Sequence, residues 1–409
     1  MRILFLSQVL PYPLDSGPKV RSYYVIRHLS QYHQVTLLAF ARPDDRLEEI
    51  DHLSNFCDVH TVLMHRSRAR DVRHLAASLL SGDAFVIRRD YVPEMAQKLT
   101  DLLQTYAFDA VHADQLWMAQ YALRAKRITP AVKIVLDEHN AYFQIYRQLA
   151  QTESHLLKRI LLEREWRVVR QFEAKACTQF DQVITVTDGD RLILGNVVQD
   201  IGRVNRKWSL PKISAIPICI DTQGTRPVDS VAGSTNVLYM GTMFWQPNID
   251  GVLWFARKVW PHVLKQVPQA TFTIVGKNPP EAVKELSDEA SIFVTGYIPD
   301  PVPYLEKAAA FIVPLLSGSG MRVKILDAWT AGLAVISTSI GAEGIQYRDG
   351  ENILVADSAE LFTNALVKVL REREWARGLA VNGRHWVEAH YDWKHVYKAW
   401  DPIYLPGKT

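Results

Sequence analysis

Short runs of β-branched and apolar residues alternate with helical patterns along the 409-residue chain. Such alternation is typical of parallel sheets whose strands are joined by crossover helices. We expect strands at residues 3–7, 35–40, 60–64, 110–112, 134–137, 183–187 and 213–216, and then at 237–240, 271–275, 292–295, 311–313, 334–338 and 353–355. The sequence therefore predicts an α/β protein with two open sheets.

The length of the chain favours two domains, because a single hydrophobic core seldom grows beyond about 250–300 residues. Residues 222–235 contain Gly, Pro, Ser and Thr without an apolar period, which is typical of a linker. We therefore expect a first domain at 1–221 and a second at 236–390. The last segment, 391–409, is rich in Trp and Tyr, and we expect it to pack back onto the first domain.

Composition excludes several classes of protein. The three cysteines are widely spaced, so buried thiols in a reducing compartment are expected rather than disulfides. No apolar run reaches the roughly 18 residues that span a bilayer, and the start of the chain resembles a strand rather than a signal peptide. A net charge of +3 is too small to indicate nucleic-acid binding. We expect a cytoplasmic protein.

Arginines are concentrated in the first domain, at positions 66, 68, 70, 73, 88 and 89, and residues 154–172 mix basic with apolar side chains. Together they could form a surface for anionic lipid at the inner face of the membrane. The alternative is an ordinary solvated face beside a helix that packs on the core. The sequence leaves both interpretations open.

A glycine-rich turn after the expected strand at 311–313 is the most informative loop. Gly318 and Gly320 allow backbone amides to approach a ligand, and the helix that follows offers unpaired N–H groups to an anion. Arg322 and Lys324 add positive charges in the first turn of that helix, where they oppose its dipole unless an anion binds. Asp327 follows about 4.5 Å further along the axis, a step comparable with that from a diphosphate to a ribose.

This stretch resembles the donor-site motif of glycosyltransferase family 4, in which two glutamates eight residues apart precede Ala-x-x-x-Gly. Ser319 and Asp327 stand at the two glutamate positions. The resemblance implies that Asp327 binds ribose hydroxyls, that Ser319 lies near the donor sugar without a charge, and that Gly318, Gly320 and Met321 line the donor site. Arg322 and Lys324 are the residues that we expect to neutralise the diphosphate.

The resemblance covers most of the chain and implies the GT-B architecture, two Rossmann-like domains whose sheets face a central cleft. Residues 216–221 resemble the exit from the first domain, and residues 239–245, with Gly241, resemble the start of the donor domain without its usual basic pair. Tyr297 and Ile298 resemble the loop around the nucleotide base, or else form a plain turn. Glu343 follows another strand, where it contacts the donor sugar or lies in a solvated loop.

In the first domain, His139 follows an expected strand and resembles the active-site histidine of the family, which implies contact with the donor sugar. His112 is a weaker candidate after another strand. Gly17 lies in a loop similar to the family's glycine-containing loop after the first strand, where it could admit phosphates or the acceptor, with Lys19 beside it.

The resemblance implies transfer with retention from a nucleotide diphosphate sugar to a glycan or polyprenyl-linked acceptor, in polysaccharide biosynthesis. We expect no metal and no other cofactor, because no His/Cys cluster or Asp-x-Asp triplet suggests a cation site. A nucleotide-sugar epimerase of the same fold and a catalytically degenerate sugar-nucleotide-binding module remain alternatives. An oxidoreductase is disfavoured, since no Gly-x-Gly-x-x-Gly follows the first strand.

Overall fold

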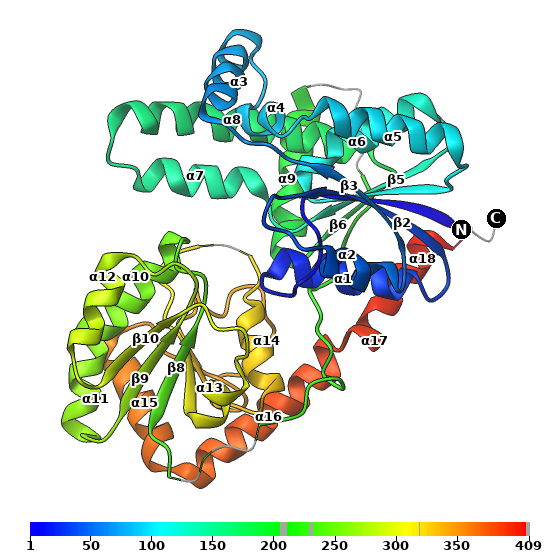
Figure 1. Ribbon diagram of the computed structural model, residues 1–409. Helices are drawn as coiled ribbons and strands as arrows, with labels where there is room; N and C mark the ends of the chain where they lie inside the picture. Colours follow the sequence, from blue (N-terminus) through cyan, green and yellow to red (C-terminus); the bar gives the residue numbers. More distant parts are fainter. Residues whose placement is uncertain (205–210, 229–230, 232, 319, 406–409) are drawn as a thin grey trace. The chain divides into compact units, whose positions relative to one another are not determined.

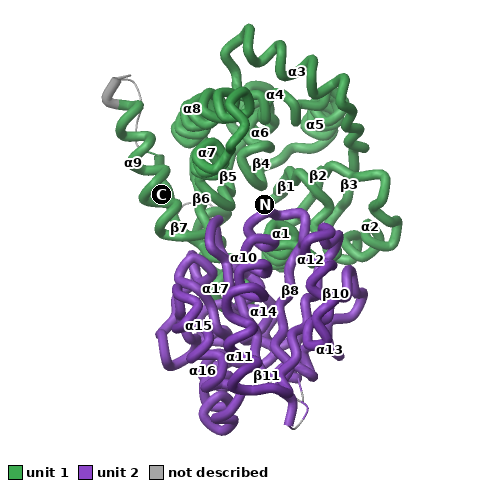
Figure 2. The backbone as a smooth tube through the Cα atoms, turned by 90° about the vertical axis from the view of Figure 1, so that its left-hand side faces the viewer, with its two compact units in different colours: residues 1–219, 393–409 green, residues 220–392 purple. Residues whose placement is uncertain are grey.

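The computed structural model describes residues 1–204, 211–228, 231, 233–318 and 320–405. The chain forms two compact units, coloured separately in Figure 2. Unit 1 comprises Met1–Cys219 together with the end of the chain from Trp393, and unit 2 comprises Ile220–Asp392. Each unit is an α/β layer structure built on its own parallel sheet, so the predicted fold class is confirmed.

The sheet of unit 1 has seven parallel strands in the order β3-β2-β1-β4-β5-β6-β7. Its strands are β1 Arg2–Ser7, β2 Gln34–Ala41, β3 Asp58–Leu63, β4 Ala110–Asp114, β5 Lys133–Glu138, β6 Gln182–Thr185 and β7 Ile213–Ala215. Its helices are α1 Gly17–Leu29, α2 Leu47–Ser54, α3 Arg68–Ser81, α4 Phe85–Arg89, α5 Pro93–Thr105, α6 Leu116–Ile128, α7 Tyr142–Thr152, α8 Leu156–Gln179, α9 Asp188–Val204, α17 Trp393–Val396 and α18 Asp401–Tyr404.

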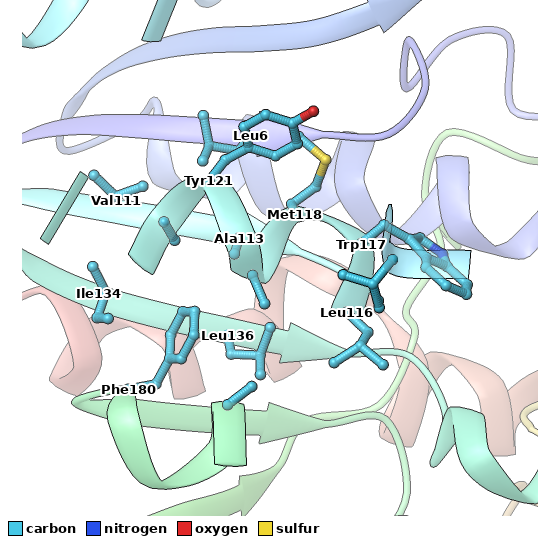
Figure 3. Close-up of a cluster of buried hydrophobic side chains, with 14 of the residues drawn as sticks. Leu6, Val111, Ala113, Leu116, Trp117, Met118, Tyr121, Ile134, Leu136 and Phe180 are labelled. Atoms are coloured by element: carbon cyan, nitrogen blue, oxygen red, sulfur yellow. The ribbon is translucent and has the colours of Figure 1, made fainter. Parts of the chain in front are cut away.

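The central strands of unit 1 are buried along almost their whole length because helices cover both faces of the sheet. In Figure 1, α1 and α2 lie on one face of the sheet and α5 and α6 on the other. Figure 3 shows β-strand side chains such as Leu6, Val111 and Leu136 against Met118 and Tyr121 of α6. These side chains have no more than 2% of their surface exposed. This core holds the carboxyl ends of β1, β4 and β5 beside one another.

The end of the chain packs on α1 and β4 within unit 1. Trp393 stacks near Tyr24 at a centroid distance of 5.7 Å, and the Tyr404 hydroxyl lies 2.6 Å from Nδ1 of His112. His112 is fully buried and also stacks on Phe5 at 4.2 Å. The aromatic residues near the C-terminus therefore cover the core of the first unit, and His112 is part of that packing.

The sheet of unit 2 has six parallel strands in the order β10-β9-β8-β11-β12-β13. Its strands are β8 Asn236–Met240, β9 Thr271–Val275, β10 Ile292–Gly296, β11 Ala308–Val313, β12 Val335–Ser337 and β13 Leu354–Val355. Its helices are α10 Gln246–Trp254, α11 Trp260–Gln266, α12 Glu281–Lys284, α13 Val302–Lys307, α14 Val323–Thr330, α15 Ala359–Arg371 and α16 Arg373–Tyr391. A π-helical turn, Phe255–Val259, joins α10 to α11.

The segment expected to be a linker belongs to unit 2 in its described part. The amide of Val228 donates to the carbonyl of Ala331 at 3.0 Å, and the amide of Val231 donates to the carbonyl of Glu306 at 2.8 Å. Arg384 of α16 also donates to the carbonyl of Thr225 at 3.0 Å. Composition alone misses these bonds, because a polar segment without a period can still satisfy its backbone on a neighbouring helix.

The three cysteines are buried free thiols, as expected. In the described part of the chain, no helix combines the length and the apolar character needed to cross a membrane.

A glycine fixes how α16 packs on α14. A Cβ atom on Gly383 would lie 2.4 Å from Cδ1 of Trp329, a fully buried side chain of α14 whose indole nitrogen donates to the carbonyl of Asn352 at 2.9 Å. The absence of a side chain at residue 383 thus lets the two helices approach and holds α14 in place.

We predict that Gly383→Ala lowers the free energy of unfolding by about 1–3 kcal/mol, because the new methyl group overpacks Trp329. Gly378→Ala on the same helix is the matched control, since a Cβ atom on Gly378 would have no heavy atom within 4 Å beyond its own helix backbone and chain neighbours. That change should instead stabilise the protein by about 0.4–1 kcal/mol. Denaturant unfolding of both variants is the measurement, and equal effects would contradict the packing described here.

Candidate donor-site and active-site residues

The loop between β11 and α14 has the backbone geometry that glycine allows. Gly318 has φ +115° and Gly320 has φ +85°, values that residues with a side chain rarely adopt. Ser319, predicted to lie near the donor sugar, falls outside the described residues. The side chain of Met321 is buried directly before the helix. The loop therefore brings backbone close to the start of α14.

Lys324 lies in the first turn of α14 with its ammonium held inside unit 2. Its Nζ donates to the Tyr239 hydroxyl and to Oδ1 of Asn248, each at 3.1 Å, and lies 4.6 Å from the centroid of the Tyr239 ring. A Cβ atom on Gly241 would lie 2.6 Å from the same nitrogen, so only glycine leaves room for it. The structure thus brings the predicted residues Gly241 and Lys324 together.

Both hydrogen-bond partners of the Lys324 ammonium are neutral, so neither offsets the cost of burying its charge. Burial and, to a lesser extent, the positive charge of Arg322 together lower the pKa of Lys324 to about 7, against the attraction of Asp327. Arginine and lysine at the N-terminus of a helix also face its positive end. The ammonium is therefore poised to gain stability from an anion.

Arg322 is the N-cap residue of α14 and is 6% exposed. Its guanidinium lies 5.2 Å from the centroid of the Trp245 ring, and a Cβ on Gly318 would lie 2.8 Å from its Nη2. Burial lowers the pKa of Arg322 to about 10, whereas the charge of Glu343 raises it. Glu343, an exposed predicted site residue, is thus the carboxylate that acts electrostatically on Arg322.

Of the other predicted residues of unit 2, Asp327 and Tyr297 are exposed and Ile298 is half-buried. Asp327 lies on α14, three residues after Lys324, and its side chain is exposed. Tyr297 and Ile298 follow β10, and the Tyr297 ring is 66% exposed with Nζ of Lys277 6.0 Å from its centroid. An exposed aromatic ring next to a cation is a surface on which a planar base can stack.

In unit 1, a buried ion pair occupies the carboxyl end of β5. Arg21 of α1 donates to both carboxylate oxygens of Asp137, with nitrogen–oxygen distances of 2.7 and 2.9 Å, and to the carbonyls of Ile216 and Pro217 at 2.6 and 2.9 Å. Both side chains are fully buried. Burial alone would lower the pKa of Arg21, but the charge of Asp137 raises it overall. Burial alone would raise the pKa of Asp137, but the charge of Arg21 holds the pKa of that carboxyl well below its ordinary value.

His139 follows β5 and is 3% exposed. Its Nε2 lies 2.9 Å from Oδ1 of Asp114, at the end of β4. The other Asp114 oxygen accepts hydrogen bonds from Ser7 at 3.0 Å and Ser22 at 2.9 Å. The imidazole therefore lies beside a carboxylate at the edge of the sheet where parallel α/β folds bind ligands.

His112, Asp114 and Asp137 each place one potential ligand atom within 4.8 Å of the others. This spacing alone would suit a cation. However, Arg21 already binds both oxygens of Asp137, and Nδ1 of His112 contacts Tyr404. The negative charge of the group is compensated by a guanidinium, so these residues fit a metal poorly.

Gly17 is the first residue of α1, and the Lys19 ammonium next to it pairs with Asp15 at 3.2 Å. The structure thus places Gly17 and His139 in unit 1 and the other described site residues in unit 2. Sequence reasoning did not find the pairing of Arg21 with Asp137 in unit 1. It also did not find the neighbours of Lys324 and Arg322 in unit 2, which are Tyr239, Asn248 and Trp245. Their contacts join residues far apart in the chain, and no local motif signals them.

Comparison with known proteins identifies the class to which this chain belongs, a glycosyltransferase with the GT-B fold. The glycine turn and the helix start at the carboxyl ends of the parallel strands agree with that class. Residues 16–197 match the family model described as Glycosyltransferase Family 4, and residues 234–372 match the one described as Glycosyl transferases group 1. The chain belongs to these glycosyltransferases, as the motif resemblance implied.

Similar proteins agree with this assignment. An uncharacterized 44.6 kDa protein in the cps region of Klebsiella pneumoniae is 22% identical over 97% of this chain and 98% of its own length. A GDP-mannose-dependent alpha-(1-6)-phosphatidylinositol monomannoside mannosyltransferase of Mycobacterium tuberculosis is 27% identical over 32% of this chain and 38% of its own.

Solved structures share the fold. HepE of Anabaena, in complex with UDP and glucose, has a TM-score of 0.66 and 13% identity, and the match covers 98% of this chain and 99% of that one. TarM of S. aureus, in complex with UDP, Fondaparinux and alpha-GlcNAc-glycerol, has a TM-score of 0.65 and 10% identity over 99% and 100% of the two chains. At these identities the likeness establishes the GT-B fold.

Three buried carboxylates surround the start of α7, close to His139. Glu173 accepts hydrogen bonds from the amides of Tyr142 and Phe143 at 2.8 and 3.1 Å, and Asp190 accepts from the amide of Ala141 at 3.0 Å. Glu138, fully buried, precedes His139. Burial, followed by the charges of Glu173, Asp137 and Asp190, raises the pKa of Glu138 well above its ordinary value. Burial also raises the pKa of Glu173 to about 8.

These raised pKa values imply a pH-dependent stability. A folded state that holds a proton more tightly than the unfolded chain gains stability fully below the unfolded pKa, and loses it as pH rises through the folded pKa. For Glu173 that window runs from its ordinary value of 4.5 to about 8. We predict that wild-type protein melts at a lower temperature at pH 8 than at pH 6.

Glu138→Gln tests this origin, because an amide imitates the protonated carboxyl. We expect the variant to melt higher than wild type at pH 8 and to show a smaller difference between pH 6 and pH 8. Glu94→Gln, at an exposed position of α5, is the control and should keep the wild-type pH profile. A Glu138→Gln profile that is as steep as wild type would exclude Glu138 as a source.

Proposed function

We propose that the chain is a retaining hexosyltransferase that moves a sugar from a UDP- or GDP-sugar to a glycan or polyprenyl-linked acceptor. The observation that carries the proposal is the ammonium of Lys324, buried among neutral partners at the start of α14. A diphosphate would add negative charge beside Arg322 and Lys324. Helix amides, Arg322 and Lys324 would share its oxygens.

In the reaction, the bond between the anomeric carbon and the diphosphate oxygen breaks, and the acceptor hydroxyl oxygen bonds to that carbon on the same face. The acceptor proton passes to the departing diphosphate. Charge accumulates on the leaving group as the bond breaks, so preorganised cations lower the barrier there. Arg322 and Lys324 have this role in the proposal, and their positions do not need to change during the step.

The remaining site residues take positions around the donor. We assign ribose binding to Asp327, base stacking to Tyr297 and Ile298, and close approach of the loop backbone to Gly318, Ser319, Gly320 and Met321. We further assign contact with the donor sugar to Glu343 and His139, donor binding to Gly241, and passage of phosphates or acceptor to Gly17. The contact of His139 with Asp114 supports its role, since an oriented imidazole can steady charge at the reacting centre.

A place in polysaccharide biosynthesis is supported by the Klebsiella relative from a cps region. UDP in HepE and GDP-mannose in the mycobacterial relative support a nucleotide diphosphate sugar as donor. We propose that transfer proceeds in the cytoplasm without a metal, since Arg322 and Lys324 would neutralise the diphosphate that a cation neutralises elsewhere.

The start of α8 supports peripheral contact with a membrane. Leu156, Leu157, Ile160 and Leu161 are exposed, and at about 100° per residue they lie within one arc of roughly 140°. The exposed basic residues 158 and 159 lie on the two sides of that arc. Apolar side chains flanked by cations fit the boundary between acyl chains and anionic headgroups. A lipid-linked acceptor would be presented at such a surface.

We predict that Lys324→Met reduces the turnover of donor sugar by about 10²–10³-fold, because it removes one cation from the leaving group. Methionine has a similar length and removes the cost of burying the Lys324 ammonium, so the melting temperature should not fall. Lys284→Met, an exposed position in unit 2, is the matched control and should leave turnover unchanged. An unchanged rate for Lys324→Met would remove the leaving-group role.

The same assay separates the rival functions. Product formation should require an acceptor and should be unaffected by EDTA. A changed sugar without acceptor indicates an epimerase, and donor binding without any product indicates a degenerate binding module. Because the pKa of Lys324 is about 7, donor affinity of the wild type should fall as pH rises above 7, and this fall should be absent in Lys324→Met.

We predict that Leu157→Glu combined with Ile160→Glu weakens binding to phosphatidylglycerol vesicles by about tenfold or more, since two apolar side chains no longer leave water. Co-sedimentation is the measurement. Leu192→Glu, at an exposed leucine of α9, is the control and should bind as wild type does. Absence of vesicle binding by the wild type would contradict the membrane contact.

A further inference from the structure

A buried carboxylate in unit 1 gathers two arginines near the carboxyl end of its sheet. Asp90, 1% exposed, accepts from Arg66 at 3.1 Å and from Nε of Arg89 at 2.9 Å. Its second oxygen accepts from Gln8 at 2.8 Å. Gln8 directly follows β1, Arg66 follows β3, and Arg89 ends α4. Three separate elements thus converge on one carboxylate.

Positive charge exceeds negative charge around this carboxylate. Residues 65–91 contain six arginines and three aspartates, and no lysine or glutamate. One aspartate, Asp83, pairs with Arg88 at 3.0 Å. Arg70 directs its guanidinium to the carbonyls of residues 65, 89 and 91. It therefore adds a third cation beside Arg66 and Arg89 without adding a carboxylate.

Neighbouring charges act on the pKa of Arg66 in both directions. Burial lowers the pKa of Arg66, and the charges of Arg89 and Arg42 lower it further, while Asp90 and Asp71 oppose this. The Arg66 side chain remains 47% exposed. Of its five N–H donors, Asp90 takes one from Nη2. Arg66 is therefore an accessible cation with donors left for a second oxyanion.

We propose that Arg66 and Arg89 form an anion site for a phosphate or diphosphate group of the acceptor, with Asp90 as the residue that positions both guanidinium groups. The acceptor assignment rests on the proposed transferase function, whereas the anion site itself does not. Planar guanidinium groups suit phosphate oxygens because they donate in a fixed fork. The site lies at the edge of the sheet where α/β folds collect ligands.

The test uses inorganic pyrophosphate and the full chain carrying Lys324→Met, so that the proposed donor site is disabled. Calorimetric titration compares this protein with one that also carries Arg66→Gln and Arg89→Gln. The matched control carries Arg68→Gln and Arg73→Gln, which remove the same charge from exposed positions in the same segment. Arg66→Gln alone is added, because Arg89 then still pairs with Asp90 and preserves the fold.

We expect Arg66→Gln, alone or with Arg89→Gln, to weaken pyrophosphate binding by about tenfold or more, and the control pair to change it by much less. Equal losses in both pairs, or no binding in the Lys324→Met background, would overturn the anion site. Because no transfer is measured, this failure is distinct from failure of the transferase proposal.

Phosphatidylglycerol vesicles distinguish the source of the phosphate. If the arginine pair is needed for pyrophosphate but not for vesicle binding, the ligand is the phosphate of an acceptor. If the arginine substitutions abolish both pyrophosphate binding and vesicle binding, the ligand is a headgroup of the bilayer. That result would overturn the acceptor assignment but not the anion site.

Discussion

Burying a positive charge at the carboxyl edge of a parallel sheet is the constraint on which both units depend. In unit 1 the charge of Arg21 is met by both oxygens of Asp137 and by two backbone carbonyls. In unit 2 the ammonium of Lys324 donates to a hydroxyl and to an amide oxygen, which are both neutral. The first arrangement raises the pKa of its cation and the second lowers it. Arg21 is therefore neutralised within unit 1, whereas under the proposed function a ligand completes the surroundings of Lys324.

The glycines around α14 follow from the same constraint. Space beside the Lys324 ammonium exists because residue 241 has no Cβ, and Gly276 in turn lets the next loop approach the carbonyl of residue 241. Gly318 similarly leaves room for the Arg322 guanidinium. Gly241 and Gly318 therefore each leave space for a charged group, whereas Gly276 leaves space for backbone. Substitution of Gly241 or Gly318 would displace a cation.

The fold could be read from the sequence because its signals are local. Each predicted strand overlaps a strand of the structure, since β-branched runs between helical patterns specify buried parallel strands residue by residue. The cations at 322 and 324 were also visible, because a glycine turn before a helix is a contiguous motif. The partners of those cations were not visible: Tyr239 and Asn248 are 85 and 76 residues away from Lys324. Pairings of that kind depend on strand order, which periodicity does not encode.

Net charge gives little guidance to where an anion binds in this protein. The excess of three positive charges in residues 65–91 equals the net charge of +3 for the whole chain, so the remainder of the chain is neutral on balance. Arg322 and Lys324 lie in that neutral remainder. Because charges beyond about 8 Å are largely screened at physiological ionic strength, the effect on a diphosphate that we propose for them would come from proximity and burial. Under that proposal, attraction of the donor in unit 2 is a property of one helix start, whereas in unit 1 a whole segment carries the positive charge.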